Sequence, residues 1–504
     1  MELQMIPTTT ARRLGRRQAN NAHSNGFRFA LTGIILMLIL SGCAAVGPDY
    51  TPPPTDAPAD WHSVTDENGI TVAATSSEEL AHWWTVFNDP TLTGLIEKAT
   101  TGNTDLRQAQ ARLREARARR GISEADRFPT FTASGAASSS KSSKELGSGT
   151  IRELYTAGFD AKWELDLFGA KRRALEAADA DLEASREDLN DVLVSLLAEV
   201  ARNYLEVRTY QTRLAIANEN LCTREETAAL TRQRKATGLA SQLEVEQITA
   251  VLEQARAQLP ALETGLRQAE NRLTVLIGEQ PGSLTDTLAQ PQPIPAVPEQ
   301  LLVGVPTEVL RHRPDVRRAE RQLAAQTARI GVATAALYPD LSLSGSIGLE
   351  ALTPGRLFNS DAQNSSARAG VSWSVFDFGA IRQNIEIQNA QQEQALINYE
   401  GTILTALEEV ENSLTAYGRE QHRYQSLLRA ATATENSFVM ARQQYEAGLI
   451  NFLTVLDSQR SMLSTQDQVA NSRSAITANL ISIYKALGGG WTSAAAPNMN
   501  TQQD

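Results

Sequence analysis

The chain has 504 residues and a formal net charge of −11 at pH 7. An acidic chain is not drawn to nucleic acid by its overall field, so we expect no nucleic-acid partner. The sequence also lacks a phosphate-binding glycine loop, a GxSxG elbow and an HExxH pair, and its five histidines are scattered. We therefore predict no catalytic site, no metal site and no cofactor.

The first 42 residues are predicted to be a signal peptide. Five arginines precede an apolar run, Phe29 to Leu40, that is too short to span a bilayer. The run ends in Leu40-Ser41-Gly42-Cys43, which resembles a bacterial lipobox, so we expect Cys43 to be the lipidated mature N-terminus. The alternative is an N-terminal membrane anchor with a chance cysteine. With Cys43 lipidated no intrachain disulfide is possible, and Cys222 is interpreted as a small buried hydrophobe.

Downstream of Cys43 the chain contains the same unit twice, at a constant offset of 210 residues. A proline-rich tether (43–80) precedes the first copy (81–280). A second proline-rich segment (281–306) leads to the second copy (307–490), and a polar tail (491–504) is predicted to be disordered. Two copies are too few for a solenoid and indicate a pseudo-symmetric ring or barrel. The matching residues include Asp105 with Asp315, Trp163 with Trp373, Phe168-Gly169 with Phe378-Gly379, Gly238-Leu239 with Gly448-Leu449, and Gly278 with Gly488.

Each copy begins with a predicted helix, 105–125 or 315–336, which is rich in strong helix formers. The hydrophobic period then changes to two. Such alternation is typical of strands with one apolar and one polar face, and it fits both a lipid-facing barrel and a soluble half-buried sheet. The alternating segments are 155–167, 341–349, 367–375 and, more weakly, 130–137.

Four strands per chain bear on the choice between these two kinds of sheet. Lipid cannot satisfy an open sheet edge, and the smallest membrane barrels have about eight strands. A lipid-facing sheet would therefore have to be shared, with eight strands from two chains or twelve from three. A barrel of this kind makes the protein an obligate oligomer.

Each copy then continues as a long helical hairpin. No proline or glycine occurs between Ala170 and Thr237, and leucines recur every seven residues from Leu175 to Leu196. This spacing indicates coiled-coil-like packing. The long helices are predicted to break at Gly238 and Gly448, and a second helix returns from each break.

At this point the sequence resembles the TolC-like outer-membrane factors, specifically the lipoprotein branch that serves tripartite (RND-type) efflux systems. The resemblance covers nearly the whole mature chain. It is carried by Gly47-Pro48-Asp49-Tyr50, by the segment Trp83 to Leu92, by Asn103-Thr104-Asp105-Leu106 with Arg313-Pro314-Asp315-Val316, and by the junctions Trp163 to Gly169 and Trp373 to Gly379.

The resemblance implies a mainly α-helical protein with a membrane β-barrel. A homotrimer would form a 12-stranded barrel in the outer membrane of a Gram-negative bacterium, in contact with its lipid, above a periplasmic α-helical tunnel. The protein would be a passive exit duct for drugs, metals or other small molecules. Its partners would be a periplasmic adaptor (membrane fusion protein) and an inner-membrane pump.

The resemblance also implies two sets of site residues. Thr237, Gly238, Leu239, Ala240 and Ser241 resemble a tip bound by adaptors, and Gly448 and Leu449 mark the second tip. Leu453, Asp457 and Arg460 lie in a segment that resembles the periplasmic gate, although Asp457 and Arg460 also fit an ordinary i,i+3 helix pair. The competing functions are a periplasm-spanning scaffold lipoprotein without a conduit, an autonomous porin and, least supported, an enzyme.

Overall fold

A computed structural model describes residues 45–54, 57–63, 70–72, 77–298 and 301–492. Cys43 and residues 493–504 lie outside these residues. The described chain divides into two compact units. The first contains residues up to Thr51, Arg117–Asp181 and Leu323–Ala395, and the second contains Pro52–Ala116, Leu182–Gln322 and the chain from Leu396 onward.

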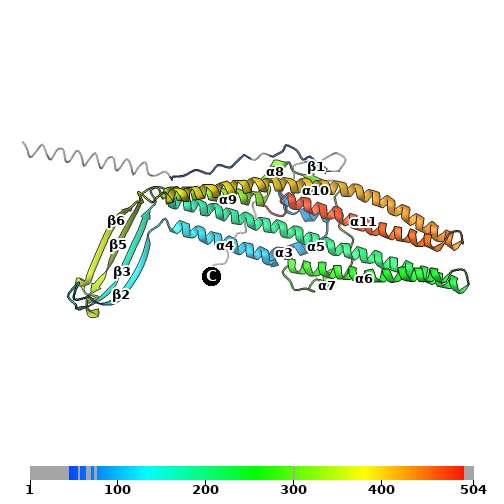
Figure 1. The fold of residues 1–504 in the computed structure, drawn as a ribbon, viewed down its shortest axis with the longest axis horizontal. Coiled ribbons are helices and arrows are strands. Elements are labelled where there is room, and N and C mark those ends of the chain that lie inside the picture. The colour runs from blue at the N-terminus through cyan, green and yellow to red at the C-terminus, as the bar shows by residue number, and fades with distance from the viewer. Residues whose placement is uncertain (1–44, 55–56, 64–69, 73–76, 299–300, 493–504) are drawn as a thin grey trace, which may run out of the picture. The chain divides into compact units, whose positions relative to one another are not determined.

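The first unit is built on a four-stranded antiparallel sheet with the order β2-β3-β5-β6 (Figure 1). Its strands are β2 (Thr130–Lys141), β3 (Ile151–Leu165), β5 (Asp340–Ala351) and β6 (Gln363–Ser372). The 3₁₀ turns η3 (Pro354–Arg356) and η4 (Ser360–Ala362) lie between β5 and β6. The predicted strands are therefore present, but β6 ends three residues before the expected Val375.

The register of the sheet repeats with the sequence. Phe131 is opposite Ala161 in the first hairpin, and Leu341 is opposite Val371 in the second. These two pairs are related by the same offset of 210 residues. The duplication is thus preserved in the hydrogen-bonded register and not only in the order of the elements.

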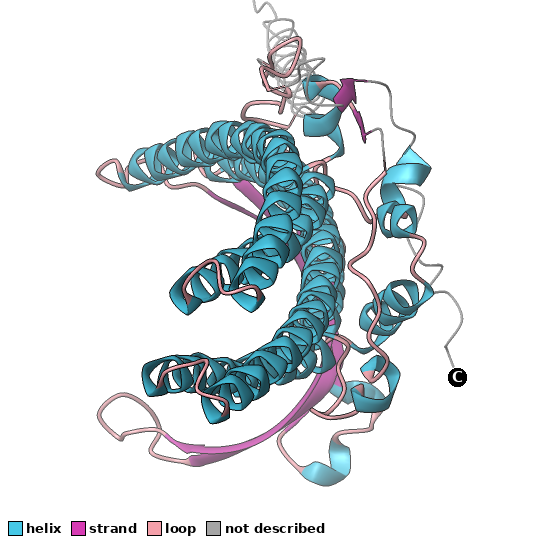
Figure 2. Ribbon diagram, turned by 90° about the vertical axis from the view of Figure 1, so that its right-hand side faces the viewer, coloured by secondary structure: helices cyan, strands magenta, loops and turns pink. Residues whose placement is uncertain are grey.

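The second unit contains most of the long helices (Figure 1). The helices α5 (Ala170–Ala236) and α10 (Ala380–Glu446) each have 67 residues, and the helices α6 (Gln242–Leu276) and α11 (Phe452–Ala486) each have 35. Figure 2 shows each hairpin closed by a short turn. Each copy opens with a 22-residue helix, α4 (Thr104–Ala125) or α9 (Pro314–Ala335), close to the predicted bounds.

The main core of the second unit contains the C-terminal end of the predicted leucine stripe. Leu196 is buried there, Leu189 packs against it, and Val200 and Val207 of α5 continue the buried face. The segment around Trp83 packs on the same core, with the Trp83 ring stacked on Tyr484 at 5.3 Å. Asp89 caps the following helix, α3 (Pro90–Gly102), by accepting hydrogen bonds from the amides of Thr91 and Leu92.

Several short elements were not predicted from the sequence. The tether contains β1 (Ile70–Val72), which pairs in parallel with β4 (Leu301–Val303) of the proline-rich linker. The other short elements are α2 (Ser77–Ala81), the 3₁₀ turn η2 (Trp83–Phe87), α7 (Thr285–Leu288) and α8 (Pro306–His312).

The interpretation of Cys222 as a small buried hydrophobe is wrong, because its side chain is exposed. Its neighbour Leu221 faces the core instead. In an α-helix adjacent residues point about 100° apart, so an apolar stripe through Leu221 leaves Cys222 outside it.

Candidate functional site

The two hairpin turns have the same backbone conformation. Gly238 and Gly448 have φ values of 76° and 75°, the left-handed region that favours glycine. The amide of each glycine donates to a carbonyl three residues back, and the amide of the next leucine donates to one five residues back. These are the two bonds of a Schellman motif, which ends a helix sharply.

The residues after the two glycines differ in sequence, but in each turn one of them caps the returning helix. Ser241 caps α6 in a capping box with Glu244, and Asn451 caps α11 by accepting from the amide of Thr454 at 3.0 Å. Leu239 and Leu449 are 68% and 75% exposed. Each turn therefore presents an apolar side chain on a rigid, fully capped backbone, with Thr237 exposed and Ala240 half-buried beside the first.

The helices next to the two turns share one packed cluster. Ile248 and Leu252 of α6 are buried in the same core as Tyr445 of α10 and Phe452 of α11. The Arg234 guanidinium of α5 lies over the Tyr445 ring at 4.7 Å. The first copy has Lys235 and Gln242 where the second has Tyr445 and Phe452, so the aromatic part of this core comes from the second copy.

The predicted gate residues lie on one exposed strip of α11. Arg460 Nη1 and Asp457 Oδ1 are 3.2 Å apart, and both side chains are more than half exposed. Leu453 is 51% exposed. The ion pair forms within one chain, but an exposed pair of this kind contributes only about 0–1 kcal/mol.

A second arginine extends the positive charge near the predicted gate residues. Arg224 and Arg460 line one cavity of about 500 Å³, together with Arg213, which is paired with Asp467 at 2.8 Å. Burial of the Arg224 guanidinium, reinforced by the charge of Arg460, lowers the pKa of Arg224. Arg460 therefore has a second arginine, Arg224, in its neighbourhood.

Sequence reasoning missed Gln459, which lies between the two charged gate residues. Its side chain is only 1% exposed, and neither its amide nitrogen nor its amide oxygen has a hydrogen-bond partner in the described part of the chain. The sequence could have indicated a buried polar residue here, because Gln459 interrupts an apolar stripe at helical spacing. The stripe is formed by Phe452, Val455, Leu456, Met462 and Leu463.

The sheet presents an apolar face to its surroundings. Phe131, Phe159, Ile347 and Val371 lie on this face and are 63–76% exposed. The opposite face carries polar contacts such as Ser134 to Asp160. A soluble half-buried sheet would cover its apolar face, so the observed exposure favours contact with lipid.

The junctions between strands and helices are also duplicated. Trp163 Nε1 donates to the carbonyl of Arg127, and Trp373 Nε1 donates to that of Leu337, both at 3.0 Å. The starts of α4 and α9 are duplicated as well. Asn103 donates to the carbonyl of Leu276 at the end of α6, and Arg313 donates to that of Ala486 at the end of α11, both at 2.8 Å.

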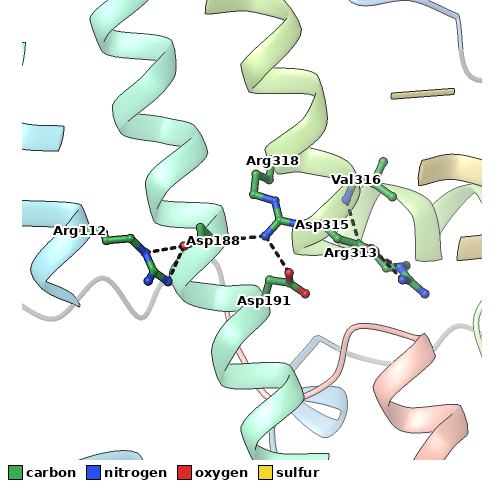
Figure 3. Close-up of polar contacts among 7 residues, drawn as sticks. All are labelled: Arg112, Asp188, Asp191, Arg313, Asp315, Val316 and Arg318. Atoms are coloured by element: carbon green, nitrogen blue, oxygen red, sulfur yellow. Dashed lines mark hydrogen bonds and ion pairs between the residues drawn. The ribbon is translucent and has the colours of Figure 1, made fainter. Parts of the chain in front are cut away.

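One ion network joins the two copies in the second unit, as Figure 3 shows. Arg318 of α9 contacts Asp188 and Asp191 of α5, each at 2.9 Å, and Arg112 of α4 shares Asp188 at 3.0 Å. Burial raises the pKa of Asp191, opposed by the charge of Arg318. The network fixes α5 between α4 and α9.

Two further observations limit the chemistry of the described residues. Among them no cluster of three or more His, Cys, Asp or Glu side chains could hold a metal ion. None of the helices that the structure describes is long and apolar enough to cross a membrane.

Duplicated helical hairpins and a sheet with an exposed apolar face define the class of an outer-membrane channel protein.

Comparison with known proteins gives the family. The pattern described as "Outer membrane efflux protein" matches residues 95–279 and again residues 305–489, which are offset by the same 210 residues. The chain belongs to the outer membrane efflux protein family. Its function is that of an outer-membrane efflux channel, and its location is the outer membrane.

Relatives along nearly the whole chain support this assignment. The chain is 33% identical to the pyoverdine export outer membrane protein OpmQ of Pseudomonas aeruginosa, over 90% of this chain and 97% of OpmQ. It is 31% identical to the cation efflux system protein CusC of Escherichia coli, with the same coverage. It resembles the solved structure of the outer-membrane channel OprN with a TM-score of 0.83 and 39% identity, covering 89% of this chain and all of the OprN chain.

Proposed function

We propose that three copies of this chain form a passive exit duct, with a shared 12-stranded barrel in the outer membrane and an α-helical tunnel in the periplasm. The observation that carries the proposal is the sheet. Its apolar face is exposed and its outer strands, β2 and β6, have one free edge each among the described residues. Lipid does not tolerate a free edge, so the sheet must be completed by other chains.

We propose further that Cys43 carries the lipid and that the two turns dock a periplasmic adaptor, which links the duct to an inner-membrane pump. The turns support docking because they are rigid and end in exposed leucines. Leu453, Asp457 and Arg460 would form the periplasmic constriction. The cargo would be drugs, metals or other small molecules, moved without a catalytic step or a cofactor in this chain.

The test of the duct is oligomeric mass and conductance. The full-length protein, purified in mild detergent, should have the mass of a trimer by light scattering and should dissociate on heating in SDS. Reconstituted in planar bilayers, it should give discrete channel openings. A monodisperse monomer would refute the shared barrel, and a trimer without any conductance, even in the gate variant discussed below, would favour the scaffold function.

A further inference from the structure

One row of the sheet carries two positive charges on the polar face. Ser344 of β5 is opposite Lys162 of β3 on one side and opposite Arg368 of β6 on the other. Residues that are directly opposite one another lie on the same face of a sheet, and Lys162 shares its face with Asp160, two residues earlier on β3. This is the face opposite to the apolar one, and both cationic side chains are exposed on it.

The spacing in this row suits a small anion. Neighbouring strands are about 4.8 Å apart, so the backbones of Lys162 and Arg368 are separated by roughly 10 Å, with Ser344 between them. The serine side chain is short, whereas the lysine and arginine side chains are long. The two cationic groups can therefore both reach an anion that lies over Ser344.

Two polar groups of the row are unused in the described part of the chain. There the Ser344 hydroxyl makes no hydrogen bond and the Arg368 guanidinium forms no ion pair. The neighbouring serines on the same face are already bonded, because Ser346 shares a hydrogen bond with Ser366 at 2.7 Å and Ser342 donates to the carbonyl of Gly370. The free donors are thus concentrated at one point of the face.

The nearest carboxylates on this face are held by other groups. Glu164 contacts Lys162 at 2.9 Å and Lys171 of α5 at 3.2 Å. Asp160 accepts a hydrogen bond from Ser134 of β2, the strand that lies on the far side of β3 from Arg368. Lys162 is therefore partly neutralised, whereas the charge of Arg368 is available to a ligand.

We propose that Lys162, Ser344 and Arg368 form a binding site for an oxyanion group, a carboxylate or a phosphate, of a solute that passes through the duct. Arg368 supplies a planar fork that can hold two oxygens, Lys162 supplies a compact charge, and Ser344 supplies a hydroxyl donor. The inference rests on the proposed function, because it takes the polar face of the sheet as the lining of the duct. It adds the class of chemical group that this lining favours.

The site lies at the end of the sheet from which the long helices continue. β3 ends at Leu165 and is followed by α5 from Ala170, and β6 ends at Ser372 and is followed by α10 from Ala380. In the proposed duct a solute that leaves the helical tunnel would meet this row before most of the barrel. A charge at such an entrance raises the local concentration of ions of opposite sign.

The duplication does not by itself produce this row. The residues that correspond to Lys162 and Arg368, at an offset of 210, are Ser372 and Gly158, which carry no charge. The two cations thus come from positions that are not equivalent in the two copies, and the pairing of the copies brings them into one row. The site occurs once per chain, which gives three sites in a trimer.

Binding of inorganic pyrophosphate to the full-length trimer in mild detergent, measured by calorimetry, tests the site. Arg368→Gln should weaken binding by about tenfold, because it removes a charge-assisted contact, and Arg368→Lys should weaken it less. Arg152→Gln is the matched control and should leave binding unchanged. It removes an exposed cation from the same face of β3, but its register partner, Ser140, is uncharged.

The hydroxyl has a matched control of its own. Ser344→Ala should weaken pyrophosphate binding, because it removes the free donor between the two cations. Ser346→Ala removes a hydroxyl that is bonded to Ser366 and should not weaken binding. Equal losses in the two serine variants would overturn the role of Ser344.

Ion selectivity in planar bilayers is the second measurement. A unit charge about 10 Å from a passing ion has a small screened effect in about 0.1 M KCl, but three copies act together, so Arg368→Gln should lower the chloride-to-potassium permeability ratio about two- to fivefold. Arg368→Lys keeps the charge and should keep the ratio. Asp160→Asn removes a negative charge from the same face and should raise it.

The outcomes separate this site from the duct itself. A conducting trimer that binds no pyrophosphate, or that loses equal affinity through Arg368→Gln and Arg152→Gln, would overturn the site and leave the duct. An unchanged permeability ratio in Arg368→Gln would overturn the role of the row in selectivity. A wild-type protein that is a monomer would overturn the proposed function.

Discussion

Replacing the buried Gln459 by methionine should stabilise the hairpin that carries the proposed gate residues. The side chain is 1% exposed and both polar atoms of its amide lack a partner among the described residues. A buried polar group without a hydrogen bond costs about 1–3 kcal/mol, and methionine has a similar length and helix propensity without that cost. The free energy of unfolding of this region should therefore rise by about 1–3 kcal/mol.

Two measurements can detect a change of this size. Some amides of α11 exchange only when the helix opens and exposes residue 459. Their hydrogen exchange should slow by about 5- to 150-fold, since each 1.4 kcal/mol is a factor of ten. The Tm of the whole protein should rise by only about 1–3 °C, because the entropy of unfolding grows with chain length. Gln468→Met, an exposed site on the same helix, is the control and should change neither quantity.

The result that would refute this reasoning is a loss of stability in Gln459→Met. Such a loss would mean that the amide makes hydrogen bonds in the assembled protein and contributes to its stability. If the prediction holds, the polar side chain is retained at a cost to stability. The hairpin would then be less stable than its sequence could make it, which suits the gating role proposed for Leu453, Asp457 and Arg460.

The remaining predictions concern the proposed gate, the first turn, a half-buried histidine and the lipid. Asp457→Ala with Arg460→Ala should raise single-channel conductance in planar bilayers, because it removes the 3.2 Å ion pair, and unchanged conductance would place the constriction elsewhere. Gly238→Glu should abolish export with trimers intact, because a Cβ at this glycine meets no atom within 4 Å and the strain of a side chain at its φ of 76° falls on the exposed turn. Export by the assembled variant would exclude docking there. Burial lowers the pKa of His312, so on acidification the unfolded chain binds a proton at this residue before the folded protein does. The free energy of unfolding should therefore fall as the pH drops below about 6.5. His312→Phe should make the Tm less dependent on pH between about pH 5 and 7. Cys43→Ser should leave unprocessed precursor without an acyl label, and normal labelling would disprove the lipid site.

Most of the fold could be predicted because the sequence contains it twice. The helices at the start of each copy and the breaks at Gly238 and Gly448 lie where the repeats place them. The pairing of β1 with β4 could not be predicted, because three-residue strands carry no measurable period. Its hydrogen bonds join residues more than 200 positions apart, and local propensity says nothing about such contacts.

The site was predictable in part for the same reason. The two glycines located the turns. The gate segment is a prediction that rests on the resemblance, and Gln459 was overlooked although its apolar stripe is visible in the sequence. The ion network around Asp188 could not be derived from the sequence. Charged residues on a helix surface are usually solvated, and only the packing of α4, α5 and α9 shows which of them meet.

Differences between two otherwise equivalent copies show where the duct departs from sixfold regularity. The first copy has Leu243, Gln247 and Ala250 where the second has Leu453, Asp457 and Arg460, so the ion pair occurs once per chain. A trimer would then carry three such pairs, alternating with neutral positions around the axis. Each pair joins two residues of one helix and is worth only about 0–1 kcal/mol, so it would resist opening weakly. Under the proposed function any such resistance would be distributed over the three chains, whereas the strands of the sheet have the same register in both copies and show no such difference.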